Sequence, residues 1–131
     1  MLKNILINLF ICTLWPPQAI ASDAECIAIT LHKEAATEGL LGKKAVHDVI
    51  ITRMKSSGKS ACQVIKEPNQ FSWVTKDTKF TATKEQLTTY RLVSKMKPVV
   101  EGARYFHNVS VKPSWAKKMK VKIKIKRHYF Y

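Results

Sequence analysis

The first 21 residues constrain this chain most, because they decide how much of it is left to fold. A basic residue, Lys3, precedes an apolar run from Ile5 to Trp15, and small residues follow at Ala19 and Ala21. That order is typical of a secretory signal peptide, and we expect cleavage after Ala21. The run is shorter than the roughly 20 apolar residues that span a membrane. An uncleaved, weak membrane anchor is the alternative.

Residues 22–131 are then expected to form one small catalytic or binding domain with a single modest hydrophobic core. Two cysteines remain in this segment, Cys26 and Cys62. An even number of cysteines in an exported chain predicts a disulfide, and two buried thiols are the alternative. In the chain-entropy model, a bridge across such a loop contributes up to roughly 4 kcal/mol of stability.

The chain is strongly basic, with 23 Lys+Arg against 9 Asp+Glu. Such an excess predicts an anionic partner, either nucleic acid, anionic lipid or a bacterial wall polymer. Export to the periplasm or the extracellular space argues against nucleic acid. We therefore expect electrostatic contact with an anionic membrane or wall polymer, and we expect a monomer.

Capping patterns and apolar periodicity predict a mostly helical domain. The capping-box patterns are Ser22 with Glu25 and Thr83 with Gln86. The predicted helices cover residues 23–36, residues 43–55, a short segment after Ser60, and a long segment from about residue 84 to just before Pro98. Two glycines, Gly39 and Gly42, are expected to bracket a turn between the first two helices.

The C-terminal stretch "KVKIKIKRHYFY" alternates apolar residues with lysines, and Val121, Ile123 and Ile125 share one face. Such alternation predicts a half-buried strand. The stretch "GARYFHN" is either a strand end or a loop, and Pro113 starts a turn or short helix around Trp115. The predicted fold class is therefore α+β, mostly helical, with a short antiparallel β element near the C-terminus.

An acidic pair, Glu34 and Glu38, stands at the end of the first apolar-periodic segment of this otherwise basic chain. A carboxyl group that is desolvated beside apolar helix neighbours has a raised pKa and can act as a general acid. If the helix continued to Glu38, the second carboxylate would lie near the first. The alternative is two solvated helix residues. The four histidines are scattered, and neither a metal site nor a cofactor site is predicted.

Five aromatic residues fall in loop-like stretches rather than at periodic core positions. They are Phe71, Trp73, Tyr105, Phe106 and Trp115. Polar residues stand beside them, namely Gln70, Ser72, His107 and Asn108. Aromatic faces in a groove suit sugar rings, whereas the alternative for any single aromatic is core packing.

Four stretches together resemble a known family. They are "ECIAITLHKEAATEGLLGKKAVHDVIITRM", "NQFSW", "GARYFHNVSVKPSWAKKM" and "HYFY". In this order they resemble the SleB-type cell wall hydrolase family, whose members cut bacterial peptidoglycan. The resemblance runs from about Glu25 to the C-terminus. It implies a small lysozyme-like α+β fold and peptidoglycan glycan strands as the substrate.

The resemblance also assigns roles. It implies that Glu34 is the catalytic acid and base. It implies that the substrate groove is lined by Glu38, Gln70, Ser72, Trp73, Tyr105, His107 and Asn108. The sequence departs from the family at Ala36 and Thr37, where Arg-Gly is usual, and the arginine would be a charge partner for the glutamates.

The number of acids favours one reaction over another. Hydrolysis of a glycosidic bond needs a second carboxylate across the substrate from the first. Glu38 would lie on the same side as Glu34, Asp48 is expected to be structural, and Asp77 is expected to be solvated. We therefore expect a lytic transglycosylase that cleaves the β-1,4 bond between N-acetylmuramic acid and N-acetylglucosamine, such as a phage endolysin or a bacterial wall-remodelling enzyme.

Two alternatives remain open. The first is a hydrolytic muramidase with lysozyme activity. The second is a non-catalytic basic protein that binds the wall or disrupts membranes through the lysine-rich tail from Lys117 to Arg127. The lysines of that tail would otherwise protect an edge strand from pairing with other chains.

Overall fold

The computed structural model describes residues 21–131, so the predicted signal peptide lies, apart from Ala21, outside the described residues. The helices are α1 (Asp23–Ala35), α2 (Gly39–Ser57), α3 (Ala61–Ile65), α4 (Lys84–Ser94) and the 3-10 helix η1 (Ser114–Lys118). The strands are β1 (Phe106–Asn108), β2 (Ile123–Ile125) and β3 (His128–Phe130). None of the helices in residues 21–131 is long and apolar enough to cross a membrane.

Helix α1 is the centre of the helical part, because it packs against α2, α3 and α4. Ser22 and Glu25 form the predicted capping box at its start, which satisfies free backbone N–H groups of the first turn. Buried residues such as Ile27 and Leu31 then contribute to the hydrophobic core. Helix α4 also begins with its predicted capping box, and it ends at Ser94, before the predicted end.

A disulfide joins Cys26 in α1 to Cys62 in α3, with the two Cα atoms 5.3 Å apart. The backbone N–H of Cys62 also donates a hydrogen bond of 3.1 Å to Oδ1 of Asp23. The predicted pairing of these two cysteines is therefore present in the structure. It ties the short α3, which has only five residues, to the central helix.

Helix α2 differs from its predicted bounds, because it begins at Gly39 rather than near Lys43. The predicted turn between Gly39 and Gly42 is therefore wrong. Gly39 has a left-handed φ of 71°, which suits the entry to the helix. Gly42 lies inside the helix, where a Cβ atom would overlap the Cβ of Glu38. This glycine permits a close approach rather than a turn.

The three strands form one antiparallel sheet in the order β1-β3-β2. The single tail strand that alternation predicted is instead a hairpin, in which β2 pairs with β3 and Ile125 lies opposite His128. Lys126, with a φ of 45°, lies at the turn. Ile125 is buried as expected, whereas Val121 lies before the strand and is 39% exposed. The short helix around Trp115 is η1.

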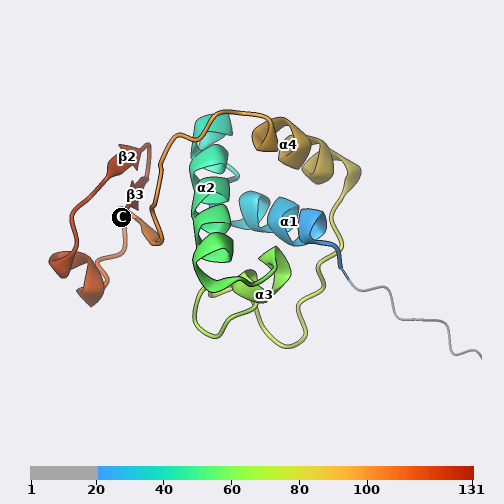
Figure 1. The fold of residues 1–131 in the computed structure, drawn as a ribbon, viewed down its shortest axis with the longest axis horizontal. Coiled ribbons are helices and arrows are strands. Elements are labelled where there is room, and N and C mark those ends of the chain that lie inside the picture. Colours follow the sequence, from blue (N-terminus) through green and yellow to red (C-terminus); the bar gives the residue numbers. More distant parts are fainter. Residues whose placement is uncertain (1–20) are drawn as a thin grey trace, which may run out of the picture.

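Helix α2 stands between the sheet and the other helices in Figure 1. Two of its side chains form hydrogen bonds with backbone groups of the C-terminal part of the chain. Asp48 Oδ2 accepts hydrogen bonds from the N–H groups of Val99, at 2.7 Å, and Val100, at 3.1 Å. Nε of Arg53 donates to the carbonyl oxygen of Arg104, at 2.7 Å. Asp48 is therefore structural, as expected.

Candidate active site

Glu34 lies in the last turn of α1 and is half-buried. Nε1 of Trp73 donates a hydrogen bond of 2.9 Å to Oε1 of Glu34. Trp73 belongs to the loop between α3 and α4, which two buried rings anchor to the core. Phe71 and Phe80 are 5% and 6% exposed, and their ring centroids lie 6.1 Å and 5.8 Å from that of Trp73. The loop therefore holds Trp73 against the carboxyl group.

The surroundings of Glu34 favour its protonated form. Burial raises the pKa of the Glu34 carboxyl group, while the hydrogen bond from Trp73 and the positive charge of Arg53 act in the opposite direction. Burial is the largest of these effects, so the pKa lies above its ordinary value. A carboxyl group of this kind can donate a proton to a leaving oxygen at a pH where an exposed glutamate is ionised.

Arg53 of α2 is a site residue that the sequence did not single out. Its guanidinium carbon lies 5.7 Å from the ring centroid of Phe71 and 5.9 Å from that of Tyr105. It is also the positive charge that lowers the pKa of Glu34. The chain therefore supplies a basic side chain near Glu34 although Ala36 stands where the family usually has arginine. The stretch "IITRM", which ends one resembling segment, was the available signal.

Two predicted groove residues share a pocket with Arg53. Gln70 and Tyr105 line this pocket, which has a volume of about 160 Å³. Tyr105 is 41% exposed, and Gln70 and the neighbouring Ser72 are exposed as well. The hydrogen bond between Trp73 and Glu34 joins the stretch "NQFSW" to the end of α1, and Tyr105 places the stretch "GARYFHN" beside Arg53 of α2.

His107 and Asn108 take part in a second cluster, centred on Trp115. Nδ1 of His107 donates to the carbonyl oxygen of Asn108, at 2.8 Å, so Nε2 accepts from the hydroxyl group of Tyr131, at 2.9 Å. The ring centroid of Trp115 lies 5.7 Å from that of His107 and 5.3 Å from that of Tyr105. Tyr105 therefore connects this aromatic cluster with the Arg53 pocket.

The side chain of Asn108 accepts hydrogen bonds within its own turn. Its Oδ1 accepts hydrogen bonds from the N–H group and the hydroxyl group of Ser110, at 3.0 Å and 2.9 Å. These contacts fix the chain direction after β1. A role of Asn108 in substrate binding stays a prediction, as it does for Gln70, Ser72 and His107.

Glu38 does not lie beside Glu34 on one helix, because α1 ends at Ala35 and Glu38 is the first flanking residue of α2. Its side chain is 4% exposed. Oε2 accepts a hydrogen bond of 3.0 Å from the N–H of Arg127 and lies 3.8 Å from Nδ1 of His128. This burial differs from the expected place in the groove. It gives Glu38 a structural contact that ties the start of α2 to the β2–β3 hairpin.

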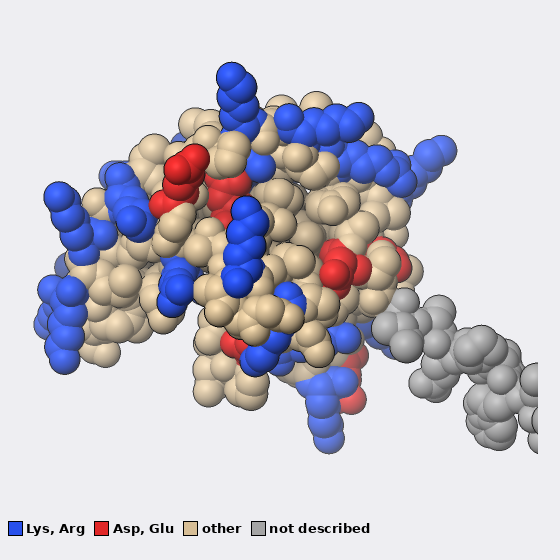
Figure 2. Space-filling model, viewed as in Figure 1, with Lys and Arg blue, Asp and Glu red and all other residues tan. Residues whose placement is uncertain are grey.

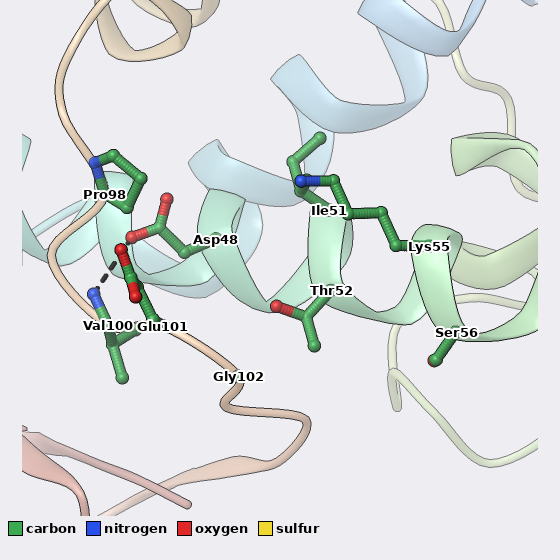
Figure 3. Close-up of a pocket in the computed structure, with 9 residues that line it drawn as sticks. All are labelled: Asp48, Ile51, Thr52, Lys55, Ser56, Pro98, Val100, Glu101 and Gly102. Carbon is green, nitrogen blue, oxygen red and sulfur yellow. Dashed lines mark hydrogen bonds between the residues drawn. The ribbon is translucent and has the colours of Figure 1, made fainter.

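A larger hollow, of about 510 Å³, lies between α2 and the segment from Pro98 to Gly102 (Figure 3). Its polar lining includes Asp48, Thr52, Lys55 and Glu101, and none of the residues around Glu34 contributes to it. Asp48 is already bonded to backbone N–H groups there. Across residues 21–131, no group of three or more His, Cys, Asp or Glu side chains could hold a metal ion.

Comparisons with known proteins identify the family and the fold of the chain. A family model described as Cell Wall Hydrolase matches residues 37–131, beginning three residues after Glu34. The fold is similar to the catalytic domain of the germination-specific lytic transglycosylase SleB from Bacillus anthracis. That match has a TM-score of 0.68 and 21% identity, and it covers 88% of this chain and 98% of that chain. A search of curated proteins found no match. The chain belongs to the cell wall hydrolase family.

Proposed function

We propose that this protein is an exported enzyme that cleaves the β-1,4 bond between N-acetylmuramic acid and N-acetylglucosamine in peptidoglycan, as a lytic transglycosylase. The observation that carries the proposal is Glu34, a half-buried carboxyl group with a raised pKa that is held by Trp73. Among the described residues, the groups that shift this pKa include Arg53 and no second carboxylate. One acid with no acidic partner suits a mechanism that uses a single glutamate twice.

Glu34 first donates its proton to the glycosidic oxygen as the bond to the anomeric carbon of muramic acid breaks. The 6-hydroxyl group of the same muramic acid then forms a bond to that anomeric carbon. The Glu34 carboxylate takes the proton of this hydroxyl group and returns to its starting state. The products are a 1,6-anhydromuramic acid end and a free N-acetylglucosamine end, and no water is consumed.

The family and the fold support the proposal at different levels. The family model supplies the substrate class, because cell wall hydrolases act on peptidoglycan. The similar solved domain belongs to a lytic transglycosylase, and the likeness to it at 21% identity is a likeness of fold. The choice of transglycosylation over hydrolysis therefore depends on the single carboxyl group and not on the comparison.

The first prediction is that digestion of purified peptidoglycan gives fragments that end in 1,6-anhydromuramic acid. Mass spectrometry detects these fragments, because each is lighter by one water than a hydrolysed fragment. Glu34→Gln is expected to lower the rate at least roughly 100-fold, because an amide cannot donate the same proton. Glu85→Gln, on the exposed side of α4, is the matched control and is expected to keep the wild-type rate.

Free reducing muramic acid ends as the main product would contradict transglycosylation and favour the muramidase alternative. Asp77, which is exposed in the loop after Trp73, would then be the next carboxylate to test. A folded Glu34→Gln variant that clears walls at the wild-type rate would exclude Glu34 as the catalytic acid. Binding of peptidoglycan without any cleavage would favour a non-catalytic wall-binding protein.

The second prediction concerns export. We propose that the exported protein begins at Ser22 and reaches the periplasm or the medium, where the Cys26–Cys62 disulfide can form. The intact mass, measured with and without reductant, gives both the first residue and the state of the two sulfur atoms. A chain that keeps Met1 would contradict cleavage, and two free thiols in the exported form would contradict the bridge.

A further inference from the structure

The C-terminal quarter of the chain carries basic charge without acidic residues. Residues 102–131 contain nine Lys and Arg and no Asp or Glu. Eight of the nine lie in residues 111–127, a segment that we call the basic lobe, and all eight side chains are exposed. They are Lys112, Lys117, Lys118, Lys120, Lys122, Lys124, Lys126 and Arg127. On the face in Figure 2, blue side chains surround the left-hand end, where Figure 1 places η1 and β2.

These cations are not used to hold the fold together. The ion pairs found in residues 21–131 involve Lys44, His47, Lys59 and His128, and none involves a Lys or Arg of the basic lobe. Lys124 lies on the edge strand β2 and contacts the ring of Tyr129 at 5.3 Å, so edge protection accounts for it. Edge protection does not account for Lys117 or Lys120, which precede the strand.

Exposed apolar side chains are interspersed with these lysines. Val111, Met119 and Val121 are 53%, 38% and 39% exposed. Val121 borders a pocket of about 480 Å³ between Lys120 and Lys122. A soluble polyanion would attract the lysines but would gain nothing from the apolar side chains. A bilayer surface with anionic headgroups attracts the lysines and also buries the apolar groups.

We propose that the basic lobe is a docking surface for an anionic lipid membrane, and that it holds the enzyme at the membrane face of the wall. Glu34 belongs to α1 and is not one of the residues 111–127 that form the lobe. The inference does not depend on which bond the enzyme cleaves. A hydrolase or a transglycosylase would be concentrated beside its substrate in the same way.

The test measures cosedimentation of the purified protein with vesicles rich in phosphatidylglycerol and with vesicles of phosphatidylcholine alone. We expect preferential binding to the anionic vesicles, weakened strongly in about 0.5 M salt because salt screens surface charge. The variant K117Q/K120Q/K122Q is expected to bind about 100-fold more weakly, at about fivefold per lysine. The matched control K84Q/K95Q/K97Q removes the same charge around α4 and is expected to change binding less than about threefold. All proteins are compared in the same form, residues 22–131, so that the predicted signal peptide does not contribute to vesicle binding.

A second variant separates a membrane from a soluble polyanion. Val121→Ser keeps every charge and is expected to weaken vesicle binding about fivefold, because less apolar surface enters the interface. It is expected to leave binding to soluble polyphosphate unchanged. Equal losses in K117Q/K120Q/K122Q and K84Q/K95Q/K97Q would overturn the proposal, because they would show that net charge alone attracts the protein. Unchanged vesicle binding by Val121→Ser, together with displacement by polyphosphate, would assign the lobe to a wall polymer instead.

Discussion

At the scale of single residues, the hydrogen bond from Trp73 lowers the pKa of the Glu34 carboxyl group and opposes the larger effect of burial. The indole N–H stabilises the ionised carboxylate, so its removal by Trp73→Phe raises the pKa of Glu34 further. The third prediction is that the basic limb of the kcat/KM profile moves to higher pH in Trp73→Phe, because the proton donor stays protonated over a wider range.

The pH profile of the rate on soluble glycan fragments checks this prediction. Arg53→Gln is expected to move the limb in the same direction, because the positive charge of Arg53 also lowers the pKa of Glu34. Tyr105→Phe is the control, since the phenol is not bonded to Glu34 and the limb should stay in place. A shift to lower pH in Trp73→Phe would contradict the assignment of Glu34 as the general acid.

Residue-scale predictions from the sequence succeeded where the residue acts through its immediate chain neighbours. Ser22 and Glu25 cap α1 as expected, because a capping box needs only residues three apart. Glu38 would lie near Glu34 only if the first helix continued to it, and the end of the helix at Ala35 places Glu38 against Arg127 instead. A contact across 89 residues leaves no local signal in the sequence.

At the scale of elements, the start of α2 depends on one close approach. A methyl group on Gly42 would overlap Glu38 Cβ, which is not the free end of a flexible side chain. Helix propensity alone predicts that Gly42→Ala stabilises the protein by about 1 kcal/mol. The fourth prediction is the opposite result, a loss of about 1–3 kcal/mol in the free energy of unfolding through overpacking.

Urea denaturation of the wild type and Gly42→Ala measures this difference. The Cys26–Cys62 bridge must be intact in both proteins, because its loss would add a separate effect of a few kcal/mol. A higher midpoint for Gly42→Ala would show that Glu38 and α2 relax without cost. The close approach would then have no structural importance.

Element boundaries were predictable only where the sequence marks them in the usual way. The hairpin turn at Lys126 and Arg127 contains no Gly, Asn or Asp, the residues that usually mark such turns. Alternation therefore predicted one strand where the structure has β2 and β3. Gly42 led to the reverse error. The sequence predicted a turn there, although this glycine lies inside α2 and allows close packing against Glu38.

At the scale of the whole molecule, two buried histidines make stability depend on pH. Burial is the main cause that lowers the pKa of His47 and of His128 below the ordinary value of 6.5. Below about pH 6.5 the unfolded chain binds protons that the native protein resists, so the free energy of unfolding falls as the pH falls. Above pH 6.5 this contribution to stability is fully present.

The fifth prediction is that the Tm decreases between about pH 6.5 and pH 5 and that H47Q/H128Q reduces this decrease. Differential scanning calorimetry across this range measures it. His32→Gln is the control, because His32 is exposed and its replacement should leave the slope unchanged. An unchanged slope in H47Q/H128Q would assign the pH dependence to other groups.

By itself, the sequence determined the local structure and the family of this protein. Helix caps, apolar periodicity and the order of short motifs such as "FSW" and "YFHN" depend on residues close together in the chain. These features were enough to predict an α+β domain and the Cys26–Cys62 pair, whereas the assignment of Glu34 as the catalytic acid stays a prediction.

Only the tertiary structure decided which groups surround that acid, because burial and charge act through space. Trp73 approaches Glu34 across 39 residues, and Arg53 reaches it from another helix. Glu38, although nearer in sequence, is bonded to the hairpin. The packing of α1, α2 and the aromatic loop sets the pKa of Glu34, and this packing depends on many distant contacts that no short stretch of sequence contains.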